Sequence, residues 1–314
     1  MTDLLFLSQA EVRRLLDLDQ LLEALNKAFV ELSAGRSSVP PRTAARTANG
    51  MLGAMTGYVD GVLESKLVSV FPENHGQGIP SHQAVIVLFD SNNGTPLALM
   101  DGTAITAIRT GASAAVAAKL LAREDAKVLA ILGAGVQGRS HLEAFPRVRD
   151  FRDIRIASRN TASARELAAL HPQARVVDSF EDAVRGADVV CCCTDAREPV
   201  IKLEWVAEGA HVSSVGGTFG PELDPAIVKA GTVFVEWRDA VRNAPPAGAH
   251  ELQGLDPDSV TELGEVISGV RPGRTSTNQL TVYKSTGHAV EDAAAARLVY
   301  DRARSEGAGQ TVSI

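Results

Sequence analysis

The sequence predicts an α/β fold, in which a Rossmann-type doubly wound parallel sheet is joined to a smaller α+β domain. A glycine motif, Gly133–Gly138, follows the apolar run Lys127–Leu132 and opens a helical pattern. Downstream, short apolar runs alternate with helical patterns, which is typical of right-handed crossovers in a parallel sheet. The length of 314 residues, 45% of them hydrophobic, is enough for two cores. We therefore expect two domains.

The first predicted domain covers residues 1–123. Leu, Val, Ala and Phe recur at helical spacing from Ser8 to Leu32, which predicts one surface helix. Gly, Pro and Asn punctuate residues 50–101, and the apolar stretches between them predict a small sheet. Its expected strands are Leu63–Phe71, Ala84–Phe89 and Leu97–Met100. A long helix is expected from about Thr103 to Arg123.

The Rossmann domain is expected over residues 124–283. A further helix, about Gly287–Ser305, lies beyond the sheet, and we assign residues 284–314 to a C-terminal helix that returns to the first domain. The predicted parallel strands are residues 127–132, 153–157, 174–177, 188–193, 210–215 and 232–236.

Charge and hydropathy exclude several partners. Lys and Arg total 31 against 38 Asp and Glu, a formal charge of −7, and no basic stripe is present, so nucleic acid and anionic membranes are not expected as partners. We find no apolar run of the roughly 18 residues that a membrane span requires. The N-terminus lacks a cationic flank and a cleavage site, so a cytoplasmic location is expected.

The cysteines are consecutive, Cys191, Cys192 and Cys193, inside an apolar stretch that predicts a buried strand. Adjacent strand residues point to opposite faces, so three thiolates there are poorly placed to share a metal. We expect small core residues and no metal site.

The glycine motif predicts a dinucleotide site. Gly133 permits a tight turn, Gly135 lets a pyrophosphate approach the backbone, and Gly138 lets helix and strand pack closely. The alternative is a tight turn in another kind of α/β unit.

The second strand indicates which nicotinamide cofactor is preferred. NAD-binding Rossmann domains usually carry Asp or Glu about 20 residues after the glycines. Here that position reads Ser158, Arg159, Asn160, and a guanidinium suits a 2′-phosphate. We therefore expect NADPH, with NADH possible; the alternative is that Arg159 is an ordinary solvated arginine.

Isolated cations in the first domain are candidate site residues. Lys66 shares a strand face with Val68 and Val70, where desolvation would lower its pKa into a range useful for proton transfer. The alternative is an edge-strand lysine in water. Arg42 and Arg109 could together grip a carboxylate, although each could equally be a surface arginine.

Two loops complete the candidate site. Gly216–Pro221 follows a predicted strand at its carboxyl end, where such sheets bind ligands, and should border the nicotinamide. Lys284–Gly287 precedes the last helix, so Ser285 and Thr286 could hold an anion. The alternative for Ser285 is a plain N-cap.

In order and spacing, these segments resemble the ornithine cyclodeaminase/mu-crystallin family over nearly the whole chain. The most specific part is Thr106, Arg109 and Thr110, directly upstream of the glycine motif. The resemblance implies a substrate domain that also forms a homodimer. The matching segments are Lys66, Gly78–Gln83, Asp101–Ser113, Gly133–Gly138, Glu262–Glu265 and Lys284–Asp292.

The resemblance also implies residue roles. Arg42, Lys66 and Arg109 would contact the substrate carboxylate, with Lys66 next to the reacting nitrogen, which makes Lys66 and Arg109 the predicted catalytic residues. The predicted cofactor-binding residues are Ser81, Arg109, Thr110, Gly133, Gly135, Val136, Gln137, Gly138, Ser158, Arg159, Asn160, Thr194 and Val215.

One position departs from the cyclodeaminases of this family, which carry Asp directly after the glycine pair. Here it is Thr218, and a neutral hydroxyl cannot act as a base near neutral pH. The family reductases lack that Asp and favour NADPH. We therefore predict a ketimine reductase acting on Δ1-pyrroline-2-carboxylate or Δ1-piperideine-2-carboxylate, with Thr218, Ser285 and Thr286 among the substrate-binding residues. The alternatives are an ornithine cyclodeaminase, an alanine-type dehydrogenase and a non-catalytic NADPH-binding protein.

Overall fold

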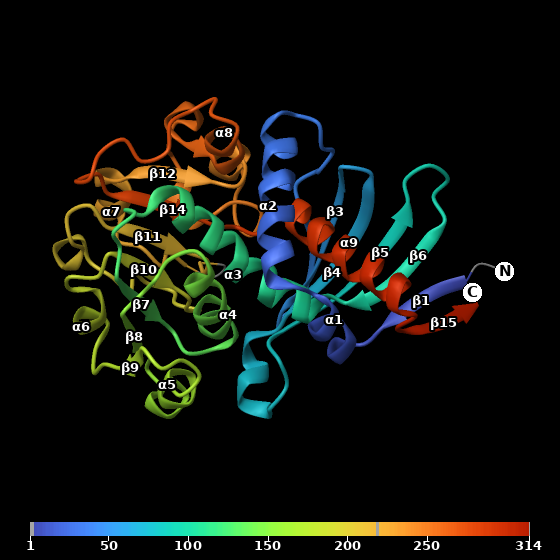
Figure 1. The fold of residues 1–314 in the computed structure, drawn as a ribbon, viewed down its shortest axis with the longest axis horizontal. Coiled ribbons are helices and arrows are strands. Elements are labelled where there is room, and N and C mark those ends of the chain that lie inside the picture. Colours follow the sequence, from blue (N-terminus) through green and yellow to red (C-terminus); the bar gives the residue numbers. More distant parts are fainter. Residues whose placement is uncertain (1–2, 218–219, 314) are drawn as a thin grey trace. The chain divides into compact units, whose positions relative to one another are not determined.

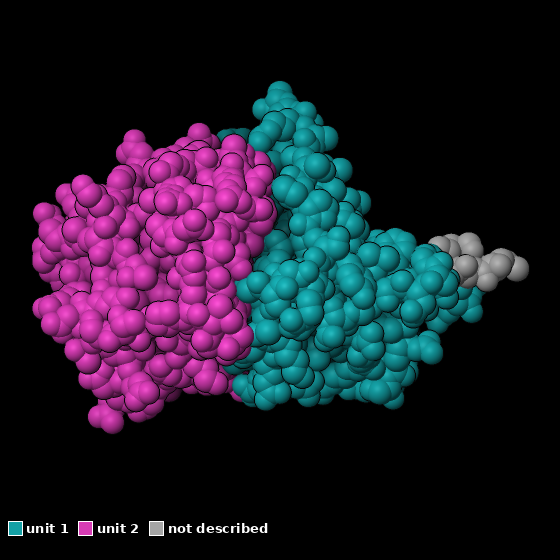
Figure 2. All heavy atoms as spheres, turned by 90° about the horizontal axis from the view of Figure 1, so that it is seen from above, with its two compact units in different colours: residues 1–109, 288–314 teal, residues 110–287 magenta. Residues whose placement is uncertain are grey.

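The computed structural model describes residues 3–217 and 220–313, which divide into two compact units (Figures 1 and 2). Unit 1 consists of Met1–Arg109 and His288–Ile314, and unit 2 of Thr110–Gly287. The first boundary falls inside helix α3 (Gly102–Leu121), whereas the sequence placed it after residue 123. The packing of α3 explains the difference, because Gly102 lies against Ala84 of unit 1 and Gly111 against Ser140 of unit 2.

Unit 1 contains a mixed sheet in the order β15-β1-β6-β5-β4-β3-β2. The three expected strands are confirmed as β4, β5 and β6, each with slightly different ends. The sequence did not individually predict β1, β2, β3 or β15, and β1 pairs with β15 from the other end of the chain. The strands are β1 (Asp3–Leu7), β2 (Thr43–Arg46), β3 (Met51–Val59), β4 (Val62–Val70), β5 (His82–Asp90), β6 (Pro96–Asp101) and β15 (Gln310–Ser313).

The expected single helix over Ser8–Leu32 is wrong. The chain instead forms α1 (Gln9–Leu15) and α2 (Leu18–Ser33), because Leu16 is extended and the Asp17 side chain caps the second helix by accepting from the Gln20 N–H at 2.9 Å. Helix α9 (Ala289–Glu306), red in Figure 1, lies across β3, β4 and β5 and packs against α2.

Alternation along β4 decides which side chains face α9. Glu64, Lys66, Val68 and Val70 are buried, while Leu67 between them is exposed. The predicted shared face of Lys66, Val68 and Val70 is confirmed. The edge-strand alternative is wrong, because β4 lies between β3 and β5 inside the sheet.

Unit 2 is a Rossmann-type unit built on an all-parallel sheet in the order β13-β12-β14-β11-β10-β7-β8-β9. The six predicted strands are confirmed; β13 and β14 were not predicted. The strands are β7 (Val128–Leu132), β8 (Asp153–Ala157), β9 (Ala174–Val176), β10 (Val189–Cys192), β11 (His211–Ser214), β12 (Thr232–Val235), β13 (Thr261–Glu262) and β14 (Thr281–Lys284).

Short helices connect these strands (Figure 1). The α-helices of unit 2, besides its part of α3, are α4 (Val136–Ala144), α5 (Thr161–Ala168), α6 (Phe180–Val184), α7 (Pro225–Ala230) and α8 (Leu263–Ile267). The 3₁₀ turns of both units are η1 (Pro72–Gln77), η2 (Phe145–Arg147), η3 (Leu203–Trp205), η4 (Arg238–Val241), η5 (His250–Leu252) and η6 (Pro257–Ser259).

The cysteines lie in or directly after β10 and are buried, as the sequence predicted. Burial raises the pKa of all three thiols, which makes them unreactive core residues. Within residues 3–217 and 220–313, no three His, Cys, Asp or Glu side chains are grouped as metal ligands would be.

Helix α3 is long and apolar enough to span a membrane, with a mean hydropathy of 1.2, so the expectation that no segment reaches this limit is wrong. However, 78% of its most apolar window is buried inside the protein, which is typical of a core helix.

Candidate functional site

Unit 1 holds a buried ion pair between the inner face of a strand and the first turn of a helix. Lys66 on β4 is 1% exposed, and its Nζ donates to Asp292 Oδ2 of α9 at 2.6 Å. It also donates to Thr106 Oγ1 of α3 at 3.4 Å. The lysine side chain is therefore held by contacts with two helices and is almost completely shielded from solvent.

Arg109 extends this pair into a cluster. Its Nε donates to Asp292 Oδ1 at 3.0 Å and its Nη1 to Glu291 Oε2 at 2.8 Å, and both acids are fully buried. Arg42 lies half-buried just before β2, close enough for its charge to lower the pKa of Asp292. The three cations proposed from the sequence thus meet around two acids of α9. The alternative that Arg109 is a surface arginine is wrong.

Burial governs the proton affinities in this cluster. Desolvation lowers the pKa of Lys66 to about 8; the Asp292 carboxylate opposes this shift and Arg109 adds to it. Burial alone would raise the pKa of Asp292, but the Arg109 and Lys66 charges outweigh it and hold the pKa below its usual value. Lys66 is therefore a cation that can lose its proton near neutral pH, beside an acid that stays ionised.

Two further titratable groups border the cluster. Glu64 is fully buried, and burial followed by repulsion from Asp292 raises its pKa well above the usual value. Burial lowers the pKa of His288, the N-cap of α9, to about 3, and the Arg42 charge contributes to the shift. Near neutral pH, His288 is therefore uncharged.

In unit 2, a different structural feature explains why glycine stands at each of the three positions of the motif. Gly133 has φ +104°, and a Cβ there would lie 2.5 Å from the Cys193 carbonyl oxygen. At Gly138 a Cβ would lie 2.1 Å from the Gly133 carbonyl oxygen, so only glycine allows this turn and helix to touch. At Gly135, the N-cap of α4, a Cβ would meet nothing within 4 Å.

That open space fits a nucleotide. The nine-residue helix α4 begins directly after Gly135, so its first N–H groups and its dipole can face a pyrophosphate. Val136 is 64% exposed and Gln137 is half-buried beside it. The protein itself gives no reason to exclude a side chain at Gly135, whereas a bound dinucleotide does.

The end of β8 carries the residues expected at the adenosine ribose. Ser158 Oγ accepts from the Asn160 N–H at 3.2 Å, and the Asn160 side chain caps α5. Arg159 is 83% exposed and forms an ion pair with Asp195 at 3.2 Å. The guanidinium is therefore accessible, and its carboxylate partner was not predicted from the sequence.

Beyond β10 and β11, a buried glutamate organises the loops expected near the nicotinamide. Glu222 Oε1 accepts from the N–H and Oγ1 of Thr194, each at 2.6 Å. Its Oε2 accepts from Ser214 Oγ at 2.7 Å and from the Gly216 N–H at 3.0 Å. Lys284 Nζ donates to the Gly216 carbonyl at 2.8 Å. Val215 lies between these contacts, and its N–H donates to the Cys192 carbonyl at 3.2 Å.

The remaining predicted site residues differ in their exposure and in their hydrogen-bond partners. Ser285 Oγ donates to Glu236 Oε1 at 2.5 Å, and Thr286 Oγ1 accepts from Trp237 Nε1 at 3.2 Å, so both hydroxyls already bind protein groups. His288 caps α9, so the N-cap alternative for Ser285 is wrong. Ser81 is half-buried in unit 1, Thr110 is 7% exposed on α3, and Thr218 lies outside the described residues.

A comparison of the sequence with protein-family models decides the family. The model described as "Ornithine cyclodeaminase/mu-crystallin family" matches residues 2–307. The chain belongs to this family.

Relatives within the family support the assignment. The mouse ketimine reductase mu-crystallin is 40% identical over 307 residues, covering 94% of this chain and 96% of that protein. The Δ1-pyrroline-2-carboxylate reductase of Thermococcus litoralis, solved with NADH and L-proline, superposes with a TM-score of 0.93 at 37% identity and covers 98% of this chain and all of that one. An archaeal alanine dehydrogenase dimer with bound NAD has a TM-score of 0.91 at 32% identity, covering 100% of both chains.

The cations of the candidate site were predicted from the sequence, but its acids were not. Arg42, Lys66 and Arg109 were singled out, and the structure brings them together. Asp292 and Glu291 stood in a matching segment without an assigned role, and their signal was only two acids in the first turn of a helix. In unit 2, the acids Glu222 and Glu236 were missed in the same way.

Proposed function

We propose that this protein is an NAD(P)H-dependent imino acid reductase that converts Δ1-pyrroline-2-carboxylate or Δ1-piperideine-2-carboxylate to the cyclic amino acid. The names of the mouse and Thermococcus relatives support this class of reaction. The observation that carries the proposal is Lys66, a buried cation with a pKa of about 8 that is paired with Asp292, a carboxylate it shares with Arg109.

Lys66 would protonate the substrate nitrogen. An imine accepts a hydride at carbon more readily once its nitrogen carries a proton, so a poised ammonium lowers the barrier. When bound, a nicotinamide cofactor supplies that hydride. Asp292 fixes the direction of the Lys66 ammonium and remains ionised, so it does not compete as a proton donor.

The cations of the cluster would bind the substrate carboxylate. Arg109 is held on two nitrogen atoms by Glu291 and Asp292, so its guanidinium is oriented before substrate arrives. Three cations surround two acids in this cluster, so the site attracts an anion such as the carboxylate of an imino acid. Such orientation can account for several kcal/mol of a reaction barrier.

We also propose NADPH as the preferred cofactor. The observation behind this is the accessible Arg159 at the end of β8, where no carboxylate follows the strand to bind a ribose hydroxyl. The Arg159→Ala variant should lower the ratio of kcat/KM for NADPH to that for NADH by about tenfold or more. Arg152→Ala, which removes another exposed arginine of unit 2, should leave the ratio unchanged.

A substrate screen tests the reaction itself. Purified protein is supplied with NADPH and, separately, Δ1-pyrroline-2-carboxylate, Δ1-piperideine-2-carboxylate, or pyruvate with ammonia, and oxidation of the cofactor is followed. The proposal expects turnover with the cyclic imines. Turnover with pyruvate and ammonia alone would instead favour an alanine dehydrogenase, the second candidate that the archaeal relative suggests. Proline and ammonia made from ornithine with NAD would favour a cyclodeaminase.

We further propose that two copies associate through the sheet of unit 1. On the face turned away from α9, Leu52, Leu67 and Val85 are 40% to 48% exposed, and Leu67 lies directly opposite Val85. Solvent-facing sides of antiparallel strands are normally polar, so this apolar face indicates an interface. The archaeal alanine dehydrogenase is described as a dimer, which favours a second copy as the partner.

Analytical ultracentrifugation tests the association. Wild type should sediment as a dimer, and Leu67→Lys should shift it toward the monomer because a charge is placed in the apolar face. Val270→Lys changes a 73% exposed valine of unit 2 and should have no effect. A monomeric wild type would contradict the proposal.

A further inference from the structure

Glu64 is a fully buried carboxyl group without a hydrogen-bond partner in the part of the chain that the structure describes. Neither of its side-chain oxygen atoms bonds to any group among residues 3–217 and 220–313. It lies on β4, two positions from Lys66, so both side chains point to the same face of the sheet. An unsatisfied buried acid costs stability, so its presence calls for a reason outside folding.

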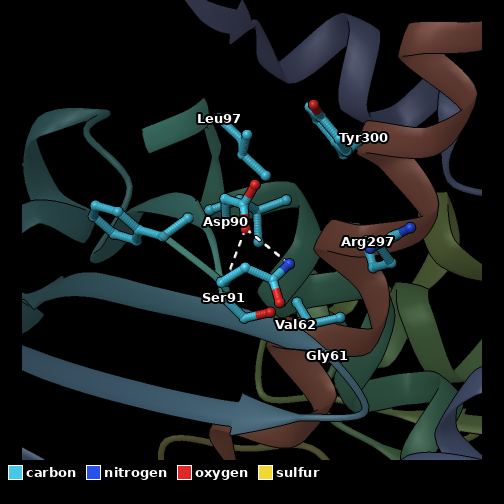
Figure 3. A pocket seen from close by; sticks show the side chains of 10 residues that line it. Gly61, Val62, Asp90, Ser91, Leu97, Arg297 and Tyr300 are labelled. Atoms are coloured by element: carbon cyan, nitrogen blue, oxygen red, sulfur yellow. Dashed lines mark hydrogen bonds between the residues drawn. The ribbon is translucent and has the colours of Figure 1, made fainter. Parts of the chain in front are cut away.

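A small pocket of about 170 Å³ lies in unit 1, and two of the residues that line it are neighbours of Glu64 in the sheet (Figure 3). Val62, the next inward residue on β4, lines it. So does Leu88, which lies directly opposite Glu64 in the register between β4 and β5. Asp90 and the α9 residues Arg297 and Tyr300 form other parts of its wall. On one side Glu64 therefore has the Lys66 cluster, and on the other a pocket within unit 1.

The charged groups around Glu64 come from three elements. Lys66 on β4 and Arg109 on α3 favour its ionised form, and Asp292 on α9 opposes it. On β3, Glu64 is paired with Gly57, and a Cβ at Gly57 would lie close to Ala289 of α9. No polar contact thus fixes Glu64 to one partner among the described residues.

We propose that Glu64 is a positioning residue that stores a proton behind Lys66 and returns it to the Lys66 amine after each turnover, with the pocket as its route to solvent. This inference rests on the proposed reductase function, because only a reaction that consumes a proton from Lys66 requires its resupply.

The proton transfers balance. The Lys66 ammonium gives one proton to the imine nitrogen and becomes a neutral amine. The Glu64 carboxylic acid then gives its proton to that amine, which restores the ammonium and leaves a carboxylate. The carboxylate takes a proton from water that enters through the pocket, so one proton from solvent is consumed in each cycle.

The two groups are suited to this exchange. The pKa of Lys66 is lowered to about 8 and that of Glu64 is raised, both chiefly by burial, so their proton affinities approach each other. As two pKa values approach each other, the free energy of proton transfer between the two groups becomes smaller. Asp292 cannot take this role because its carboxyl stays ionised between two cations.

Infrared spectroscopy tests the stored proton without any turnover. The difference spectrum between wild type and Glu64→Gln at neutral pH should contain the carbonyl stretch of a protonated carboxyl, which shifts in D₂O. A spectrum that shows an ionised carboxylate at Glu64 overturns the proposal, whether or not the protein reduces imines. Failure of the reductase proposal is seen separately, in the substrate screen.

Kinetics then test the resupply. Glu64→Gln should lower kcat by about tenfold with KM nearly unchanged, and imidazole, a proton donor small enough for the pocket, should restore kcat where the larger buffer Hepes does not. Glu64→Asp keeps an acid and should retain most of the activity. Leu97→Trp fills the pocket without changing Glu64 and should lower kcat in the same direction. An unchanged kcat in Glu64→Gln, or a loss that imidazole does not restore, contradicts the relay.

Discussion

Glu64 of unit 1 and Glu222 of unit 2 are both completely buried, but their carboxyl groups are hydrogen-bonded in opposite ways. Glu222 in unit 2 accepts four hydrogen bonds, two on each side-chain oxygen. Glu64 in unit 1 accepts none from the described residues. The first arrangement fixes loops at the ends of β10 and β11, whereas the second leaves a carboxyl that receives no hydrogen bond from the described residues.

This difference in hydrogen bonding distinguishes a structural role for Glu222 from a role in proton transfer for Glu64. A satisfied buried acid rigidifies its surroundings, because every donor around it would be stranded without it. An unsatisfied one shifts its pKa and stays able to exchange a proton. Glu222 thus holds loops of unit 2 in place, whereas in unit 1 burial raises the pKa of Glu64 and lowers the pKa of Lys66 to about 8.

Asp292→Asn should produce the largest loss of stability. It removes the carboxylate that Lys66 and Arg109 share and leaves two buried cations underneutralised. We expect the free energy of unfolding, measured with urea, to fall by about 3–5 kcal/mol. Arg14→Ala breaks an exposed ion pair with Glu306 and should leave it unchanged. A mild effect of Asp292→Asn would mean that the cluster is better solvated than its burial indicates.

The same substitution at the two glutamates tests the comparison directly. Glu222→Met should cost about 3 kcal/mol, because four donors lose their acceptor. Glu64→Met should cost little or stabilise the fold, since an apolar side chain suits an unsatisfied buried site. Calorimetry of both variants measures the two stability losses. Equal losses would contradict the proposed difference between the two glutamates.

The sequence predicted most of the fold because parallel strands are buried on both faces and read as apolar runs. It missed β3 (Met51–Val59), where two glycines weaken the pattern, and β14 (Thr281–Lys284), which ends in a lysine. It also missed the pairing of β1 with β15, for which no local signal exists. The break at Asp17 was overlooked because apolar spacing continues through it.

The site was predictable in its cations and not in its acids. Lys66 stood out as an isolated charge in a strand, and its inward direction follows from alternation. Asp292, its partner, lies 226 positions away and looks like an ordinary acid at a helix start. Glu64 lies only two positions from Lys66, but nothing in the pattern shows that its carboxyl has no hydrogen-bond partner among the described residues.

Substitution of two glycines of the same motif should affect different properties, stability at Gly138 and cofactor affinity at Gly135. Gly138→Ala places a Cβ 2.1 Å from a backbone oxygen and should lower the free energy of unfolding by about 1–3 kcal/mol. Gly135→Ala meets open space, so stability should hold while the Kd for NADPH, measured by fluorescence titration, rises. If Gly135→Ala bound NADPH as wild type does, the dinucleotide would not approach this turn.

The smallest expected effect is that of pH. It should change catalysis, which depends on Lys66 in unit 1, but not cofactor binding by unit 2. Because the pKa of Lys66 is lowered to about 8, the protonated donor is present below that pH and is lost above it. We expect kcat/KM for imine reduction to be level below pH 8 and to fall about tenfold per pH unit above it. The Kd for NADPH over the same range should stay constant, since Lys66 belongs to unit 1.

The central claim is that Lys66 is the proton donor of an imino acid reductase. The most direct test compares Lys66→Met with wild type for NADPH-dependent reduction of Δ1-pyrroline-2-carboxylate, with folding checked by circular dichroism. The account predicts a folded variant that still binds NADPH but reduces the imine at least about a hundredfold more slowly. A folded Lys66→Met protein that reduces it at the wild-type rate would contradict the account.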